Sequence, residues 1–139
     1  MTTAMNSGRR IRCLLGMLGT DVHTKGLRTL AQLLRDEGVE VIYLGEHNTV
    51  DGMVNAMVQE DVDVVGISFS IATYLHYAKQ LMDAMKAKGV TDVPVMVGGL
   101  IHPDDEPALR EIGISGIFGP RSTTPEILDF LRQAARTTA

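Results

Sequence analysis

Short apolar runs alternate with segments of helical periodicity along most of the chain. The first run, IRCLLGML at 11–18, is nearly continuous, as expected of a strand buried on both faces of a sheet. The next segment, 27–38, is amphipathic and ends at Gly38. Its four leucines share one helical face: Leu27, Leu30, Leu33 and Leu34. Repetition of this pattern predicts strands at 11–18, 39–45, 62–68, 93–99 and 114–119, and helices at 27–38, 49–61, 71–89, 103–113 and 124–135.

Strand–helix units joined by short connections predict a parallel sheet with right-handed crossovers and helices on both faces. Five such units in so short a chain favour the flavodoxin-like fold, a doubly wound, Rossmann-like α/β fold with strand order 2-1-3-4-5. Residues 1–10 are polar and are interpreted as a disordered tail, and 11–139 as a single domain.

Ligands of this fold bind where the strand order reverses, outside the carboxyl ends of the first and third strands. The sequence therefore predicts a binding site at the loops 19–26 and 68–74, with the loops 98–103 and 119–124 beside them.

Composition narrows the functional classes. The chain has 139 residues, 45% of them hydrophobic, and a formal net charge of −4, so it offers no basic field for nucleic acid or an acidic membrane surface. No apolar run reaches the ~18 residues of a membrane span. The lone Cys13 excludes an internal disulfide and favours a cytoplasmic protein. The chain is also too short for a (β/α)₈ barrel, which needs about 200 residues.

Two of the predicted loops carry polar side chains with more than one interpretation. In the first loop, a carboxylate oxygen of Asp21 can accept a hydrogen bond from His23 Nδ1–H, which makes the other ring nitrogen, Nε2, more basic. Histidines that bind metal ions commonly have a carboxylate in this position. Alternatively, Asp21 only caps a helix and His23 is an exposed residue. In the second loop, the hydroxyls of Ser68 and Ser70 either bind a polar ligand or cap the next helix.

The other two loops are equally ambiguous when taken one at a time. Gly98 and Gly99 allow a ligand to approach the backbone without meeting a Cβ atom, but they also suit a plain tight turn. The segment from Phe118 to Ser122 can be simply a strand end followed by a helix cap.

Taken together, the loops resemble a known family. The signature reads Asp21-x-His23-x-x-Gly26, then Ser68-x-Ser70, then Gly98-Gly99, each at the end of a predicted strand. It resembles the cobalamin-binding domain of adenosylcobalamin-dependent mutases and of methionine synthase, over residues 11–136.

The resemblance implies a role for each residue. His23 would be the lower axial ligand of cobalt, displacing the dimethylbenzimidazole base of the cofactor itself, and Asp21 would orient it. Gly26 would let the nucleotide tail run beside the first helix, and Ser68 and Ser70 would line the tail pocket. Gly98 and Gly99 would let the tail pass close to the backbone. Phe118 and Ser122 would flank the buried base of the tail.

Two departures from acyl-CoA mutases stand out. Met17 occupies the position of a lysine that completes a Lys–Asp–His relay in many of them, and the segment 22–25 reads Val-His-Thr-Lys instead of Gly-His-Asp-Arg. The stretches 98–101 and 116–120 nevertheless resemble the acyl-CoA mutase branch.

The implied function is that of the small, adenosylcobalamin-carrying subunit of a carbon-skeleton mutase. Such a subunit is inactive alone and contributes no catalytic residue, because the substrate sits in a large barrel-type partner subunit. The substrate stays open among methylmalonyl-CoA, isobutyryl-CoA and 2-hydroxyisobutyryl-CoA, and a glutamate mutase small subunit is the alternative.

Other classes fit less well. A corrinoid carrier for methyl transfer usually has a helical bundle ahead of this fold, and a cobalamin-dependent regulatory module is normally fused to an output domain. A receiver domain would carry an acidic phosphorylation site where this chain has Ser68 and Ser70. A metal site without a corrin would need His47 and His102 to converge on His23.

Overall fold

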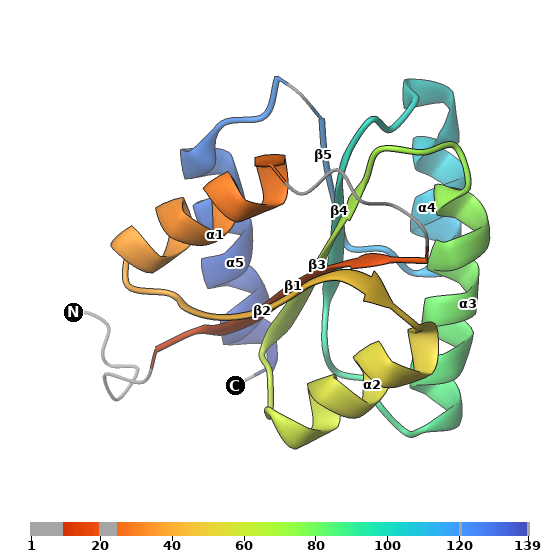
Figure 1. The fold of residues 1–139 in the computed structure, drawn as a ribbon, viewed down its shortest axis with the longest axis horizontal. Coiled ribbons are helices and arrows are strands. Elements are labelled where there is room, and N and C mark those ends of the chain that lie inside the picture. Colours follow the sequence, from red (N-terminus) through yellow and green to blue (C-terminus); the bar gives the residue numbers. More distant parts are fainter. Residues whose placement is uncertain (1–9, 20–24, 120, 139) are drawn as a thin grey trace.

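The structure is a computed structural model that describes residues 10–19, 25–119 and 121–138. These residues form one five-stranded sheet with helices on both faces (Figure 1). The strands are β1 (Arg12–Leu18), β2 (Glu40–Asn48), β3 (Val64–Phe69), β4 (Val95–Gly99) and β5 (Gly116–Phe118). The helices are α1 (Lys25–Asp36), α2 (Val50–Gln59), α3 (Tyr74–Ala87), α4 (Glu106–Ile112) and α5 (Thr124–Thr138), with a short 3₁₀ helix, η1 (Pro103–Asp105), before α4.

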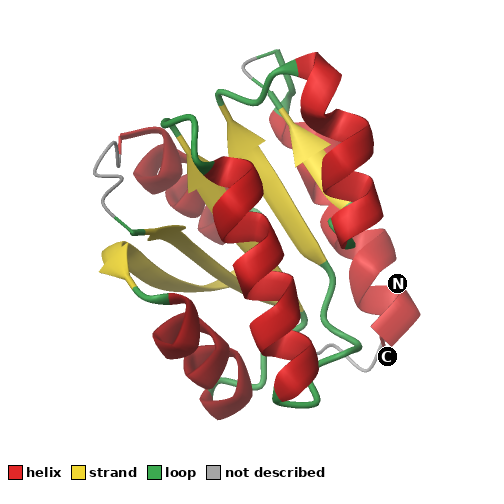
Figure 2. Ribbon diagram, turned by 90° about the vertical axis from the view of Figure 1, so that its right-hand side faces the viewer, coloured by secondary structure: helices red, strands yellow, loops and turns green. Residues whose placement is uncertain are grey.

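The strand order is β2-β1-β3-β4-β5 and neighbouring strands pair in parallel, which confirms the predicted flavodoxin-like fold. Figure 2 shows the sheet behind the helices of one face. Since β1 lies between β2 and β3, the chain order reverses at β1, and the carboxyl ends of β1 and β3 are neighbours as expected.

The sheet separates two apolar cores. Helices α1 and α5 cover one face, and α2, α3 and α4 cover the other (Figure 1). Successive residues of β1 alternate between the cores: Leu14 and Leu18 face α2 and α3, whereas Cys13, Leu15 and Met17 face α1 and α5. Burial on both faces is the physical reason for the continuous apolar run at 11–18.

Among the differences between the structure and the predicted elements, three have a clear consequence or cause. Strand β2 continues to Asn48, past the predicted end at residue 45. The predicted helix 103–113 is divided into η1 and α4, each with a proline in its first turn. Leu33 was predicted on the buried face of α1, but it is exposed, because six residues at about 100° each place it roughly 120° around the helix from Leu27.

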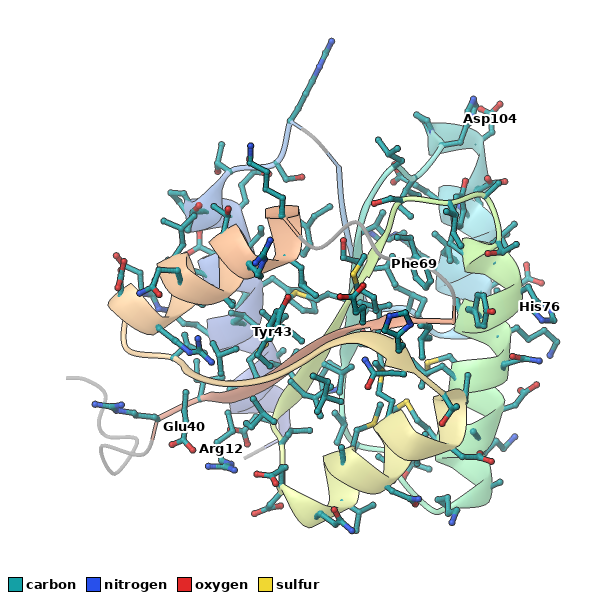
Figure 3. The ribbon with its side chains drawn as sticks, in the orientation of Figure 1. Arg12, Glu40, Tyr43, Phe69, His76 and Asp104 are labelled. Atoms are coloured by element: carbon teal, nitrogen blue, oxygen red, sulfur yellow. The ribbon has the colours of Figure 1, made fainter. Side chains whose placement is uncertain are left out.

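An ionic cluster joins the amino-terminal ends of β1 and β2 (Figure 3). The Arg12 guanidinium pairs with Glu40 and, at 3.2 Å, with Glu60, and its Nε donates to the Glu60 carbonyl at 2.8 Å. The buried Asp63 accepts from the Arg12 main-chain N–H at 2.8 Å. The cluster lies at the end of the sheet opposite the predicted binding loops.

Cys13 lies in the centre of the α1–α5 core and has no exposed surface. Burial, and secondarily the negative charge of Asp63, raises the pKa of its thiol to about 12. Because the thiolate is the reactive form, we expect no alkylation of the native protein by iodoacetamide at pH 8, but full alkylation in denaturant. Mass spectrometry measures both. Native alkylation at the rate of the denatured protein would contradict the burial of Cys13.

Candidate functional site

A cavity of about 580 Å³ lies between the sheet, α1 and the start of α5. Of the seven nominated site residues within the described part of the chain, six line it: Gly26, Ser68, Gly98, Gly99, Phe118 and Ser122. They come from four separate segments of the sequence, and the fold brings them to one half-open cavity. This volume lies within the usual range of small-molecule sites, roughly 300–1,000 Å³.

The cavity exists because the strands present small residues toward α1 and α5 near their carboxyl ends. On β3, Val64 fills the core beneath α1 and α5, but the following residues on that face are Gly66 and Ser68. On β4, Met96 is followed on the same face by Gly98. Large side chains hold α1 and α5 away from the sheet near the amino-terminal ends of the strands. The small residues near the carboxyl ends therefore leave a space under these helices.

Sequence reasoning missed Gly66. A Cβ atom there would lie 2.7 Å from Leu15 Cδ2 and 2.8 Å from Met96 Cε, both of which line the cavity. The available signal was the period of two along β3, which places a glycine on the same face as Ser68.

The lining is apolar at its base and polar at its rim. Leu15 and Met96 are buried in the sheet and form the base. The rim includes Lys25 and Thr29 in the first turns of α1, both exposed, with the Thr29 hydroxyl donating to the Lys25 carbonyl at 3.0 Å. Ser122 lies at the other side, where its Oγ accepts from the Gly119 N–H at 3.0 Å. Such a cavity suits a flat apolar ring that carries a polar, charged extension.

The backbone conformation of Gly99 and its closeness to β3 both require a glycine. Its φ is +105°, and a Cβ atom would lie 2.1 Å from the Phe69 carbonyl oxygen on β3. The same oxygen accepts from the Leu100 N–H at 2.9 Å, so the backbones of β3 and β4 end in close contact. Gly98 is less restricted, since its Cβ would lie 3.3 Å from the Phe118 carbonyl oxygen.

The other three nominated residues are not among the described lining residues. Ser70 is half-buried between β3 and α3, and it is not part of the cavity lining. Asp21 and His23, the predicted cobalt ligand, lie outside the described residues. The segment that carries them directly follows Gly19, the last described residue after β1.

A hydrogen-bonded cluster at the loop after β4 was not predicted either. The Tyr74 hydroxyl donates to Asp105 and accepts from the His102 N–H at 3.1 Å. The hydrogen bond to Asp105 raises the pKa of Tyr74. Asp105 is half-buried in this cluster.

The hypothesis of a metal site without a corrin gains no support from the described residues. Among them, no group of three or more His, Cys, Asp or Glu side chains is arranged to hold a metal ion. His47 and His102 are both largely exposed and lie on separate segments, His47 near the end of β2 and His102 in the loop after β4. His76 also points away from the sheet on the outer side of α3 (Figure 3). In the described ranges, no helix is both long and apolar enough to cross a membrane.

The fold and the cavity together define a doubly wound α/β domain with a cavity of small-molecule size beside the carboxyl ends of its strands. Residues 11–129 match the family described as the B12 binding domain. The chain therefore belongs to the B12 binding domain family.

Curated relatives extend this result. The chain is 40% identical over 121 residues to the pivalyl-CoA mutase small subunit of Xanthobacter autotrophicus, a match that covers 87% of this chain and 81% of that protein. It is 34% identical over 122 residues to the 2-hydroxyisobutanoyl-CoA mutase small subunit of Aquincola tertiaricarbonis, covering 88% and 90%. A cobalamin-binding protein from Desulfitobacterium hafniense shares the fold, with a TM-score of 0.77 at 21% identity over 91% of this chain and 60% of that one.

Proposed function

We propose that this chain is the cobalamin-binding small subunit of an adenosylcobalamin-dependent acyl-CoA mutase, with His23 as the lower axial ligand of cobalt. The single observation that carries the proposal is the cavity, which collects six nominated cofactor residues from four segments of the chain. Two relatives that match over most of their length are small subunits of acyl-CoA mutases, and this favours that branch over the glutamate mutases.

The cavity fits the nucleotide tail of cobalamin. Its apolar base, beside Gly66, matches a flat benzimidazole ring, and its rim of hydroxyls and Lys25 matches a ribose and a negatively charged phosphate. A tail bound there is withdrawn from cobalt, so the lower axial position is left for a protein ligand. The sequence offers His23 for this position, and the family signature assigns it the same role.

Each residue then has a defined task. Asp21 would accept from His23 Nδ1–H, which selects the tautomer with a free Nε2 and increases the basicity of that nitrogen. Met17 is fully buried and uncharged, so this chain tunes the pair without a lysine at that position. The bound cofactor supplies a cobalt–carbon bond that breaks homolytically, and the protein's part is to hold and orient the cofactor.

The partner would be a large, barrel-type mutase subunit that binds the acyl-CoA substrate. Two relatives that match over most of their length are themselves small subunits of acyl-CoA mutases. We therefore propose that this chain acts only together with that subunit, in the cytoplasm. An activity assay that combines the chain with a large mutase subunit and each acyl-CoA substrate tests the partnership, and turnover by the chain alone would contradict it.

Ligation by His23 has a direct spectroscopic test. Protein labelled with nitrogen-15 histidine is saturated with cob(II)alamin, and the EPR spectrum is recorded. We expect each cobalt hyperfine line to split into a doublet, because a histidine nitrogen is coordinated. His23→Ala should lose the doublet, and His76→Ala, on the outer side of α3, should retain it. A triplet in the labelled wild type, from unlabelled nitrogen of the cofactor base, would contradict the proposal.

A further inference from the structure

The end of β1 is held by a side chain that neither the sequence motifs nor the family signature mark. Asn48, the last residue of β2, turns its amide toward β1. Its Nδ2 donates to the Met17 carbonyl at 3.0 Å and to the Gly45 carbonyl at 2.9 Å, so both amide hydrogens have an acceptor. Its own main-chain carbonyl accepts from the Gly19 N–H at 3.0 Å.

These bonds replace a ladder that is irregular here. The β1–β2 register shifts between Leu15 and Gly16 and again between Gly16 and Leu18, so that β2 uses extra residues against β1. Gly45 and His47 both have positive φ, at 67° and 66°. A regular parallel ladder would bind the end of β1 through the main chain, but where β2 bulges, the Asn48 side chain takes over part of that role.

The neighbouring residues make room for the amide and hold Gly19 from a second side. A Cβ atom on Gly16 would lie 3.3 Å from Asn48 Nδ2, so the glycine opens the space that the amide occupies. Gly19 has φ of +69°, and a Cβ atom there would lie 2.2 Å from the Tyr77 hydroxyl oxygen. Gly19 is thus fixed between the Asn48 carbonyl and the Tyr77 side chain of α3.

The chain continues from Gly19 directly into the segment that contains Asp21 and His23. We infer that Asn48 is a positioning residue for the cobalt ligand, because it sets the place and direction in which the chain leaves β1. This inference rests on the proposed ligation by His23. It names a residue on another strand that acts through the Met17 carbonyl and the Gly19 amide.

A merely structural asparagine would affect folding without altering the coordination of bound cofactor. A positioning residue instead changes the equilibrium between histidine-bound and histidine-free cobalt once the protein is saturated with corrinoid. Removing a group that orients a metal ligand typically costs 10- to 100-fold in affinity or activity. We therefore expect Asn48→Ala and Asn48→Asp to lower this equilibrium constant about 10-fold or more.

The variants separate shape from hydrogen bonding. Asn48→Asp keeps the shape of the side chain but replaces the NH₂ group, with its two donor hydrogens, by a carboxylate oxygen. This oxygen repels the carbonyl oxygens of Met17 and Gly45. Asn48→Gln keeps the amide on a longer side chain and should retain more histidine-bound cobalt than Asn48→Ala. Asn55→Ala is the matched control, since Asn55 is exposed on α2 and should behave as wild type.

The readout is the nitrogen-15 doublet in the EPR spectrum of cob(II)alamin, recorded at saturation for each variant in its labelled form. If Asn48→Ala and Asn48→Asp keep the wild-type fraction of doublet, the inference is wrong although His23 ligation stands. If neither variant folds, Asn48→Gln decides, and an unchanged fraction again overturns the inference. A wild-type protein without the doublet would overturn the proposed function and this inference together.

Discussion

Gly26→Phe should remove most of the corrinoid affinity of the protein and leave its fold at least as stable. Gly26 lies in the first turn of α1 and lines the cavity, and a Cβ atom there would meet nothing within 4 Å. A phenyl ring therefore starts in open space without a clash in the free protein, and occupies the volume that we propose for the nucleotide tail. We expect the dissociation constant to rise roughly 100-fold or more, which is about 2.8 kcal/mol.

The folding stability of Gly26→Phe should increase slightly although its corrinoid affinity falls. Glycine is the least favourable residue after proline inside a helix, so the substitution should stabilise the fold by a few tenths of a kcal/mol. Gly26→Ala should bind nearly as well as wild type, and Gln32→Phe, exposed on the same helix but outside the cavity, should bind normally. Absorbance titration and thermal unfolding measure the two effects. Wild-type affinity in Gly26→Phe would mean that the tail does not bind in this cavity.

Gly99→Ala should have the largest effect on stability. The residue combines a φ of +105° with a Cβ position 2.1 Å from the Phe69 carbonyl oxygen, which belongs to the backbone and cannot move without distorting the end of the β3–β4 pair. Left-handed backbone alone costs about 1–3 kcal/mol for other residues. With the added displacement of β3, we expect a loss of about 3 kcal/mol or more in the free energy of unfolding, and a Tm lower by roughly 10 °C.

The matched control is Gly119→Ala. Gly119 also lines the cavity, but a Cβ atom there would meet nothing within 4 Å. Its free energy of unfolding should stay within about 0.5 kcal/mol of wild type in denaturant titration. Equal stability of the two alanine variants would show that β3 and β4 accommodate a side chain at Gly99, contrary to the geometry.

Gly99 also illustrates how the right residue can be nominated for an incomplete reason. The sequence interpretation took the glycine pair as room for a ligand or as a tight turn. In the structure, Gly98 and Gly99 both line the cavity, but the tightest restriction on Gly99 comes from Phe69 in the neighbouring strand. Sequence spacing carries no information about which backbone approaches a residue from another strand.

The sequence by itself determined the fold, because the apolar periods of buried strands and amphipathic helices depend only on neighbours along the chain. It also nominated the loops at the strand ends and, through the family signature, six of the residues that line the cavity. What only the tertiary structure decided depends on contacts between distant segments. Gly66 became a cavity residue because the fold turns it toward α1 and α5.

Asn48 is the clearest example of the second kind. In the sequence, Asn48 is a polar residue directly before the predicted helix 49–61, and it lies beyond the predicted end of its strand at residue 45. Its amide is significant only because β2 bulges against β1 and brings the side chain to the Met17 carbonyl, 31 positions away in the chain. Hydrogen bonds of this kind stabilise a particular pairing of strands, and that pairing exists only once the sheet has formed.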